Sequence, residues 1–316
     1  MEEIQRLASS WYNLSFQMPA IRGRLAISAL VGAAAGSICF FFQHTLHLRG
    51  GDFVWAIHLA QKVIAHQNPY DTTFEQYPLT AGLFAFPFLG LSLEAAAAIF
   101  YGLSSALLAF GLSREGYHRL LVFLAYPYWI GLLTVQWSTA ITASAFFPLL
   151  LPLAMAKPQV GLPVFLTRFS RRGFWACVAF GLLSLAVMPR WPLLWLGQLR
   201  YYQHFFAILV LPGPLILLAL LRYRDRDSWL LVISSCMPQR WFFDTLILWL
   251  IPKSRREILI TVIFSWAAGL WRSYQSPASY TEVGRWIVLS TYLPMLAIIL
   301  LRSSTRDQGE ALAPPS

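Results

Sequence analysis

The chain has 316 residues, of which 57% are hydrophobic and only 12% are charged, and its mean hydropathy is +0.56. A soluble domain carries about 25% charged residues, so this chain has too few charges to cover a water-facing surface. The net charge of +10 does not indicate a nucleic-acid partner. Lys and Arg instead collect in short segments beside apolar runs, at 168–172, 222–226 and 253–256, as the positive-inside rule predicts for cytoplasmic loops.

Several runs lack Asp, Glu, Lys and Arg, and they reach or approach the roughly 20 residues that an apolar helix needs to cross a bilayer. They are 25–42, 76–93, 95–112, 120–156, 173–189, 201–221 and 286–301. Lipid-facing backbone must satisfy its own hydrogen bonds, and a barrel would show alternating rather than continuous apolar residues. We therefore predict an all-α fold, a polytopic membrane helix bundle of about 8–11 helices.

We divide the chain into a cytoplasmic segment 1–23, a single transmembrane domain 24–302 and a disordered cytoplasmic tail 303–316. Two acids follow the first Met, unlike the basic start of a cleaved signal, so we expect the first apolar run to remain as an anchor. Residues 43–77 then form an outer loop.

Within this outer loop, apolar residues from Phe53 to Ile64 are interleaved with His58, Gln61 and Lys62 at a helical spacing. This pattern predicts an amphipathic helix lying in the membrane interface. Asn68-Pro69 ends it, because the residue before a proline resists the α conformation.

The uncharged stretch 120–156 is interrupted by prolines, and more prolines follow at 158 and 163. Broken membrane helices occur where they are buried in protein or line a wet cavity. Counting each run as one crossing would put 168–172 outside, against its charge. We therefore expect one piece of 120–163 to enter and leave on the same side.

Elsewhere we expect helices at 78–93, 95–112, 174–188, 205–221, 229–250 with an interruption near Pro238, 258–270 and 286–301. The Trp, Tyr and Arg content of 189–204 is typical of an interfacial segment at the outer face.

Ionisable groups at the membrane edge are the first candidates for chemistry, because burying a charge is costly. Asp52, after the first helix, has the chemistry of a general base toward a hydroxyl, or of a solvated helix-end acid. Lys157, in Lys157-Pro158-Gln159, suits a phosphate, or is a snorkelling lysine. Gln136 suits a sugar or phosphate, or an interhelical hydrogen bond.

Arg240 and Asp244 interrupt a further apolar run. Their i,i+4 spacing allows an internal ion pair, and Arg240 is alternatively a ligand for a substrate phosphate. We expect no cofactor and no metal: the chain has no P-loop, Gly-rich dinucleotide motif, HExxH or GxSxG. His44 and His47 near Asp52 are more simply interfacial residues than metal ligands.

Four stretches occur together in a telling order: GGDFVWAIHLAQKVIAHQNPYDTTFEQYPL, TVQWST, AMAKPQVGLPVFLTRFSRR and MPQRWFFDTLIL. Over about residues 20–270 this order resembles the type C glycosyltransferases that use polyprenol-phosphate sugars, most closely glycosyltransferase family 87, which includes bacterial mannosyltransferases. The family's usual Gly-Gln pair reads Val135-Gln136 here.

The resemblance implies a multi-pass cell-membrane enzyme of this fold, whose site faces away from the cytoplasm. It would move a mannose-like hexose from a polyprenyl-phosphate donor to a lipid or glycan acceptor, with inversion and no metal. Asp52 would be the general base, and Lys157 and Arg240 would hold the phosphate. The sugar or acceptor site would be lined by Tyr70, Tyr77, Gln136 and Gln159.

Two other functions remain open from the residues. A transporter or flippase-like protein for a lipid-linked sugar would also use broken helices and polar groups at mid-membrane depth. A shortened, non-catalytic relative would serve as a partner subunit.

Overall fold

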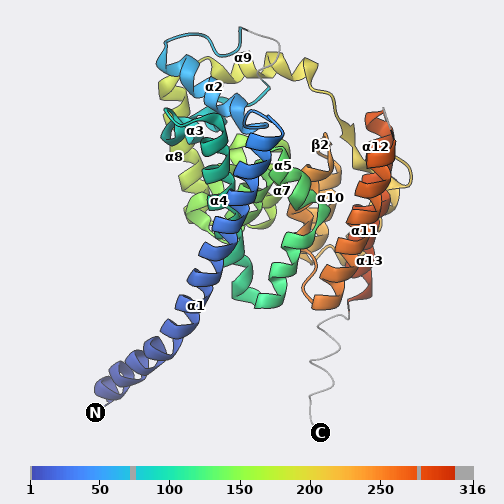
Figure 1. The fold of residues 1–316 in the computed structure, drawn as a ribbon. Helices are drawn as coiled ribbons and strands as arrows, with labels where there is room; N and C mark the ends of the chain where they lie inside the picture. The colour runs from blue at the N-terminus through green and yellow to red at the C-terminus, as the bar shows by residue number, and fades with distance from the viewer. Residues whose placement is uncertain (1, 72–75, 276–278, 303–316) are drawn as a thin grey trace.

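The computed structural model describes residues 2–71, 76–275 and 279–302, with side chains from residue 21 onward. The predicted tail 303–316 lies outside the described residues. The described chain is all-α apart from a two-residue antiparallel pair, β1 (Phe205–Phe206) with β2 (Pro238–Gln239) (Figure 1). The first part of the chain holds α1 (Glu2–Thr45), α2 (Phe53–Ile64), α3 (Leu79–Ala85), η1 (Phe86–Phe88), α4 (Leu93–Leu112), η2 (Ser113–Glu115), η3 (Tyr117–Leu124), α5 (Tyr126–Leu133) and α6 (Ser138–Ser144).

The remaining elements include several 3-10 helices, which carry the label η. They are η4 (Pro148–Ala156), α7 (Pro158–Thr167), α8 (Arg171–Val187), α9 (Trp191–Gln198), η5 (Leu199–Tyr201), η6 (Ala207–Leu209), η7 (Gly213–Arg222), α10 (Arg226–Ser235), η8 (Phe242–Leu250), α11 (Arg255–Tyr274), α12 (Tyr280–Ile287), the π-helix η9 (Val288–Tyr292) and α13 (Leu293–Leu301).

Three segments of the described residues are long and apolar enough to cross a membrane: Ile21–Thr45, Leu93–Glu115 and Tyr280–Leu301. A fourth is obtained if Arg171–Val187 and Trp191–Tyr201, bent by 93°, count as one broken span. These helices indicate a membrane protein. The expected count of about 8–11 membrane helices stays a prediction, because most of the other apolar segments are shorter than a full crossing.

Helix α4 packs closely along the C-terminal half of α1 (Figure 1). A Cβ atom on Gly32 would overlap Gly102 and Ala106 of the facing helix, so only small residues allow this approach. Near the start of the contact, Arg24 donates to the carbonyl of Phe110, and near its end Gln43 donates to that of Leu133. The 19 residues between Arg24 and Gln43 correspond to roughly 28 Å of helix, which separates the two ends of the bundle.

One end of the bundle is held by ion pairs. Asp227 lies 3.2 Å from Arg168 and 2.9 Å from Arg302, and Lys253 is 3.9 Å away. The three basic segments of the sequence therefore begin or end at one place, which we call the charged end. The opposite end, with α2 and α9 at the top of Figure 1, is called the site end.

Three hairpins rise from the charged end and turn back at the level of the site end. The first is η3 and α5 followed by α6, with its tip at 134–137. The second is η4 followed by α7, with its tip at Lys157, and the third is α10 followed by η8, with its tip at 236–241. The region 120–163 thus turns back at two hairpin tips, and Arg168 follows the second hairpin at the charged end. The cytoplasmic position expected for this end stays a prediction.

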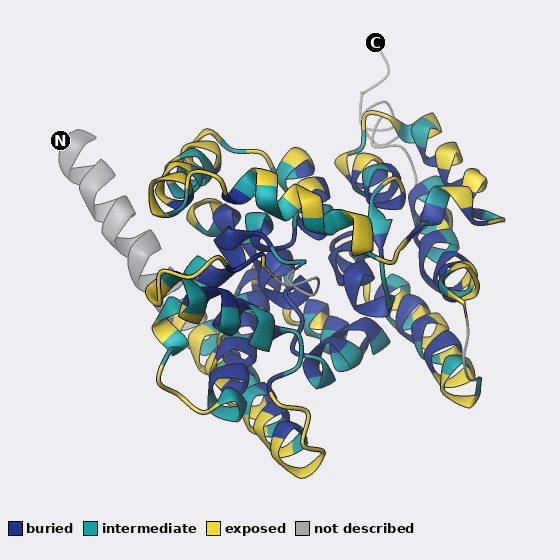
Figure 2. Cartoon of the chain, turned by 90° about the horizontal axis from the view of Figure 1, so that it is seen from above, coloured by how far each residue is buried: buried dark blue, intermediate teal, exposed yellow. Residues whose placement is uncertain are grey.

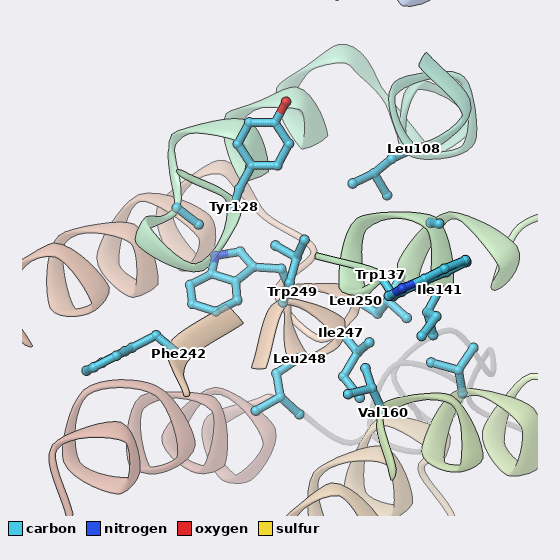
Figure 3. Close-up of a cluster of buried hydrophobic side chains, with 14 of the residues drawn as sticks. Leu108, Tyr128, Trp137, Ile141, Val160, Phe242, Ile247, Leu248, Trp249 and Leu250 are labelled. Atoms are coloured by element: carbon cyan, nitrogen blue, oxygen red, sulfur yellow. The ribbon is translucent and has the colours of Figure 1, made fainter. Parts of the chain in front are cut away.

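The core lies between these hairpins. Trp137 and Ile141 come from the first, Val160 from the second, and Ile247 and Leu248 from the third (Figure 3). Viewed from above, buried residues gather in the middle of the bundle and exposed ones at its rim (Figure 2). The hairpin tips, with their polar residues, sit directly on this apolar core.

Three expected helices are wrong in detail. The predicted helix 78–93 consists of α3 and η1 and ends at Phe88. The predicted helix 205–221 is broken into β1, η6 and η7, because Pro212 lacks a backbone donor and Gly213 packs against the carbonyl of Ala207. The predicted helix 229–250 is α10 and η8, separated by β2 at Pro238. The amphipathic helix expected in 43–77 is α2, and its apolar face packs on α3 and α4.

Candidate functional site

Asp52 is fixed by its backbone at the start of α2. Its N–H donates to the carbonyl of Thr134 at 2.8 Å, across from the first hairpin tip. Gly51 makes this approach possible: its φ is +55°, and a Cβ there would overlap the same carbonyl. Gln43, fully buried, adds a brace by donating to Leu133 and accepting from the N–H of Gly50, both at 2.9 Å.

The carboxylate of Asp52 accepts two hydrogen bonds on the same oxygen. The Tyr77 hydroxyl donates to Oδ2 at 3.1 Å, and Nε2 of Gln136 donates to it at 2.6 Å. Among the described residues Oδ1 has no hydrogen-bond partner. Burial and the charge of Asp52 hold the pKa of Tyr77 well above its usual range, so Tyr77 stays a neutral donor. The arrangement orients one carboxylate oxygen and leaves the other to accept a proton.

Gln136 lies at the first hairpin tip and is fully buried. The preceding residue, Val135, has a φ of +49°, a conformation that is costly for a β-branched side chain and is found mainly at functional sites. The N–H of Gln136 closes the turn on the carbonyl of Gly131 at 2.8 Å. This turn presents the amide of Gln136 to Asp52 on one side and to Lys157 on the other.

Lys157 lies at the second hairpin tip, where Pro158 forces it out of the α conformation. Its Nζ donates to Oε1 of Gln136 at 2.9 Å and lies 2.7 Å from Oδ1 of Asp244. The ring centroid of Phe243 is 4.6 Å away. Both charged side chains are buried, at 5% and 0% exposure, so each neutralises the other.

Asp244 therefore pairs with Lys157, and of the two alternatives for Arg240 the ion pair with the Asp244 side chain is wrong. Arg240 contacts Asp244 through its backbone N–H, which donates to Oδ2 at 2.9 Å. Burial lowers the pKa of the Arg240 guanidinium, but a hydrogen bond with Tyr280 and the charge of Asp52 outweigh it and raise the pKa overall. The Arg240 guanidinium therefore stays positively charged, and its charge interacts with that of Asp52.

A cavity of about 370 Å³ opens beside Lys157. Gln76, Gln159, Tyr202, His204 and Trp195 contribute polar and aromatic groups to its wall. A second cavity of about 290 Å³ shares Pro78, Pro158, Leu162 and Trp195 with it and is otherwise lined almost wholly by apolar side chains. The two cavities adjoin at these shared residues; both walls are mainly apolar, and the polar groups belong mostly to the first cavity, beside Lys157.

Gln159 and Tyr70 occupy different positions relative to this space. Gln159 lines the cavity and donates to the Tyr202 hydroxyl at 3.0 Å. Tyr70 is buried behind Tyr77, where its hydroxyl donates to the Tyr77 carbonyl at 3.2 Å. The structure therefore joins Asp52, Tyr77, Gln136 and Lys157 by hydrogen bonds. The backbone of Arg240 is linked to them through Asp244, and Tyr70 lies behind Tyr77.

Two residues of the site have no specific signal in the sequence. Asp244 pairs across 87 residues with Lys157, whereas its local neighbour Arg240 was the obvious partner. Tyr202 stands in the aromatic segment 189–204, whose composition predicts an interfacial segment without singling out one ring. Burial raises the pKa of Tyr202, the nearby Asp244 charge adding to it, so this phenol also remains neutral.

The segment α9 to η5 crosses the site end (Figure 1). Trp195 donates to the carbonyl of Gln76 at 2.9 Å, and Gln76 donates to that of Tyr201 at 3.2 Å. Gln198 donates to the carbonyl of Tyr70 at 3.0 Å. These bonds attach the segment to the loop that carries Tyr77 and so place Tyr202 at the cavity.

Among the described residues no group of three or more His, Cys, Asp or Glu side chains is arranged to hold a metal ion. Comparisons of the chain with family models, curated proteins and solved structures give no match.

Proposed function

We propose that the protein is an integral-membrane glycosyltransferase of a cell membrane, a multi-pass enzyme of the type C fold. It moves a hexose such as mannose from a polyprenyl-phosphate donor to a hydroxyl of a lipid or glycan acceptor, at the site end on the outer face. The observation that carries the proposal is the row of polar contacts Asp52–Gln136–Lys157–Asp244, drawn from the start of α2, the first two hairpin tips and the first turn of η8.

Each group has a role in the transfer. Asp52 takes the proton of the acceptor hydroxyl, whose oxygen forms a bond to the anomeric carbon. The bond from that carbon to the phosphate oxygen breaks with its electron pair, and the polyprenyl phosphate leaves. Lys157 and Arg240 stabilise the charge that develops on the phosphate.

The cavity supports a substrate with two chemically different parts. Gln159, Tyr202 and Trp195 offer the amide and aromatic groups that bind sugars, and the adjoining apolar space suits a hydrocarbon chain. Lys157, in the wall of the first cavity, supplies the cation that a phosphate group requires.

The test is sugar transfer by the purified protein, with Asp71→Asn as the control for Asp52→Asn. Asp71 lies in the same outer loop, is exposed and pairs with Lys62, so its substitution makes the same charge change away from the site. We expect Asp52→Asn to lower the rate by about 10²–10⁴-fold while donor binding persists, since a general base contributes that much. Asp71→Asn should leave the rate unchanged.

Two outcomes would contradict the proposal. If Asp52→Asn transfers sugar as fast as the parent, Asp52 is not the base. If the parent binds the lipid-linked sugar but never transfers it, the transporter alternative is favoured. Mass spectrometry of cellular glycolipids with and without the gene identifies the product.

A further inference from the structure

The pairing of Lys157 with Asp244 bears on how an anionic substrate can bind. Lys157 was expected to receive a phosphate, yet in this structure its charge is already matched by a carboxylate at 2.7 Å. A second anion near the same ammonium would be repelled by Asp244 at short range, in a buried place where such repulsion is poorly screened. The site therefore holds one more negative group than a simple phosphate pocket needs.

The geometry of Asp244 shows that its two oxygens have separate tasks. Oδ1 faces Lys157, and Oδ2 accepts the N–H of Arg240 at 2.9 Å. The bond from the Arg240 N–H holds the third hairpin tip on the carboxylate even when Lys157 moves away from Oδ1. Lys157 has a further contact of its own, the 2.9 Å bond to Gln136. The ammonium is thus held in place from the Gln136 side even when Asp244 no longer neutralises it.

We propose that Asp244 is an exchangeable counter-ion: Lys157 passes from Asp244 to the substrate phosphate on binding and returns to Asp244 when the product leaves. Asp244 is a positioning residue, which acts through Lys157 and Arg240. This inference rests on the proposed function, since it takes the ligand to be a lipid monophosphate. The exchange keeps the buried lysine paired with an anion both with and without ligand. The Asp244 carboxylate that Lys157 leaves behind keeps the N–H of Arg240 at Oδ2.

The exchange has a consequence for release. Transfer of the sugar leaves a lipid phosphate monoester, which carries more negative charge than the sugar phosphodiester that entered. Asp244 competes with this product for Lys157 and so speeds its departure. Removing the charge of Asp244 should then tighten product binding and slow turnover together.

The experiment measures the dissociation constant of a polyprenyl monophosphate for the purified full-length protein in detergent, with the neutral polyprenol as the probe for the chain alone. For Asp244→Asn we expect the monophosphate to bind about tenfold tighter than to the parent, because one repelling charge is gone. Binding of the polyprenol should not change. Unchanged or weaker monophosphate binding by a folded Asp244→Asn protein would overturn the proposal, and a carboxylate that only braces the site gives that result.

The control is Asp227→Asn. Asp227 is also a buried acid paired with basic side chains, but it lies at the charged end. Its substitution should lower thermal stability without changing the affinity for the monophosphate. A matching gain in affinity would show a general effect of net charge and would count against the exchange.

A second variant keeps the test decisive if Asp244→Asn does not fold. The pair K157M/D244L replaces a buried ion pair by apolar groups of similar size, a change that proteins often tolerate. We expect its affinity for the monophosphate to fall at least tenfold, toward that of polyprenol. Parental affinity would show that Lys157 does not receive the phosphate.

These readouts separate this inference from the proposed function, since none requires sugar transfer. If the parent transfers no sugar but Asp244→Asn tightens monophosphate binding, the proposed function fails and the counter-ion role stands. If the parent transfers sugar and Asp244→Asn does not tighten binding, the counter-ion role fails alone.

Discussion

Nε2 of Gln136 lies 2.6 Å from Oδ2 of Asp52, the shortest of the contacts that join the hairpin tips to α2. The other end of the same amide accepts from Lys157. A carboxamide can donate to an anion at one end and accept from a cation at the other, and this orientation of Gln136 is the one that its two charged neighbours require. Gln136 therefore keeps the acid and the ammonium apart and in register.

Substitutions of Gln136 should lower the rate of sugar transfer by amounts that depend on the charge of the new side chain. In Gln136→Glu a second carboxylate would face Asp52 and the donor to Oδ2 would be lost, so we expect transfer to fall at least 100-fold. Gln136→Met keeps the length without the repulsion but loses the hydrogen bonds to both Asp52 and Lys157, so we expect a loss of at least tenfold that is smaller than for Gln136→Glu. Equal rates for the two variants in the same transfer assay would show that Gln136 does not order Asp52.

Gly51→Ala should displace Asp52. The added Cβ meets the Thr134 carbonyl and the residue also holds a positive φ. Gly90→Ala is the control, because its φ is +90° and nothing lies within 4 Å of the Cβ position. Both variants incur a backbone cost of about 1–2 kcal/mol. Only Gly51→Ala should lose more than tenfold in transfer rate, and equal activity losses would contradict this.

Tyr77→Phe should change both activity and alkaline stability. At neutral pH we expect about tenfold slower transfer, since a hydrogen bond to the charged Asp52 is lost. The raised pKa keeps Tyr77 protonated in the folded protein, whereas in the unfolded chain a tyrosine ionises near about pH 10. Stability is therefore lost as pH rises through that value. The thermal midpoint of the parent should fall more steeply above about pH 10 than that of Tyr77→Phe, and parallel curves would be the contrary result.

Arg240→Met should weaken donor binding. The guanidinium is a cation at the site with no acidic side chain bonded to it among the described residues, so its removal should raise the donor KM at least tenfold and lower kcat less. Arg240→Lys keeps the charge without the fork of donors and should fall between. Arg200→Met, an exposed arginine at the same end, is the control. Unchanged KM in Arg240→Met would exclude a role in holding the phosphate.

The long helices were predictable because a charge-free run of adequate length has few alternatives in a membrane protein. The run 95–112 corresponds closely to α4, and the alternation of apolar and polar residues from Phe53 to Ile64 corresponds to α2. The run 25–42 lies within α1, which begins much earlier, at Glu2. The predicted helices 205–221 and 229–250 were wrong because hydropathy does not distinguish a continuous helix from short helical segments separated by prolines.

The site was predictable as a set of residues and not as a set of contacts. The sequence places polar side chains within or beside apolar runs at Asp52, Gln136, Lys157 and Arg240. Burying such groups costs free energy, so their presence there already indicates a function. The pairing of these residues depends on how the hairpins pack against one another. The i,i+4 spacing in the sequence allows Asp244 to pair with Arg240. In the structure its partner is Lys157, from another hairpin.

The hairpins also fix how many residues can separate Gln136 from Lys157. Gln136 and Lys157 are 21 residues apart, and the return of α6 and the rise of η4 use almost all of that chain. One residue added within η4 would turn Lys157 by about 120° and shift it by about 2 Å along the axis. The ammonium would then miss both Gln136 and Asp244. An insertion between Gln136 and Lys157 should therefore reduce transfer as much as loss of the lysine itself. The site depends on the length of this segment as well as on its residues.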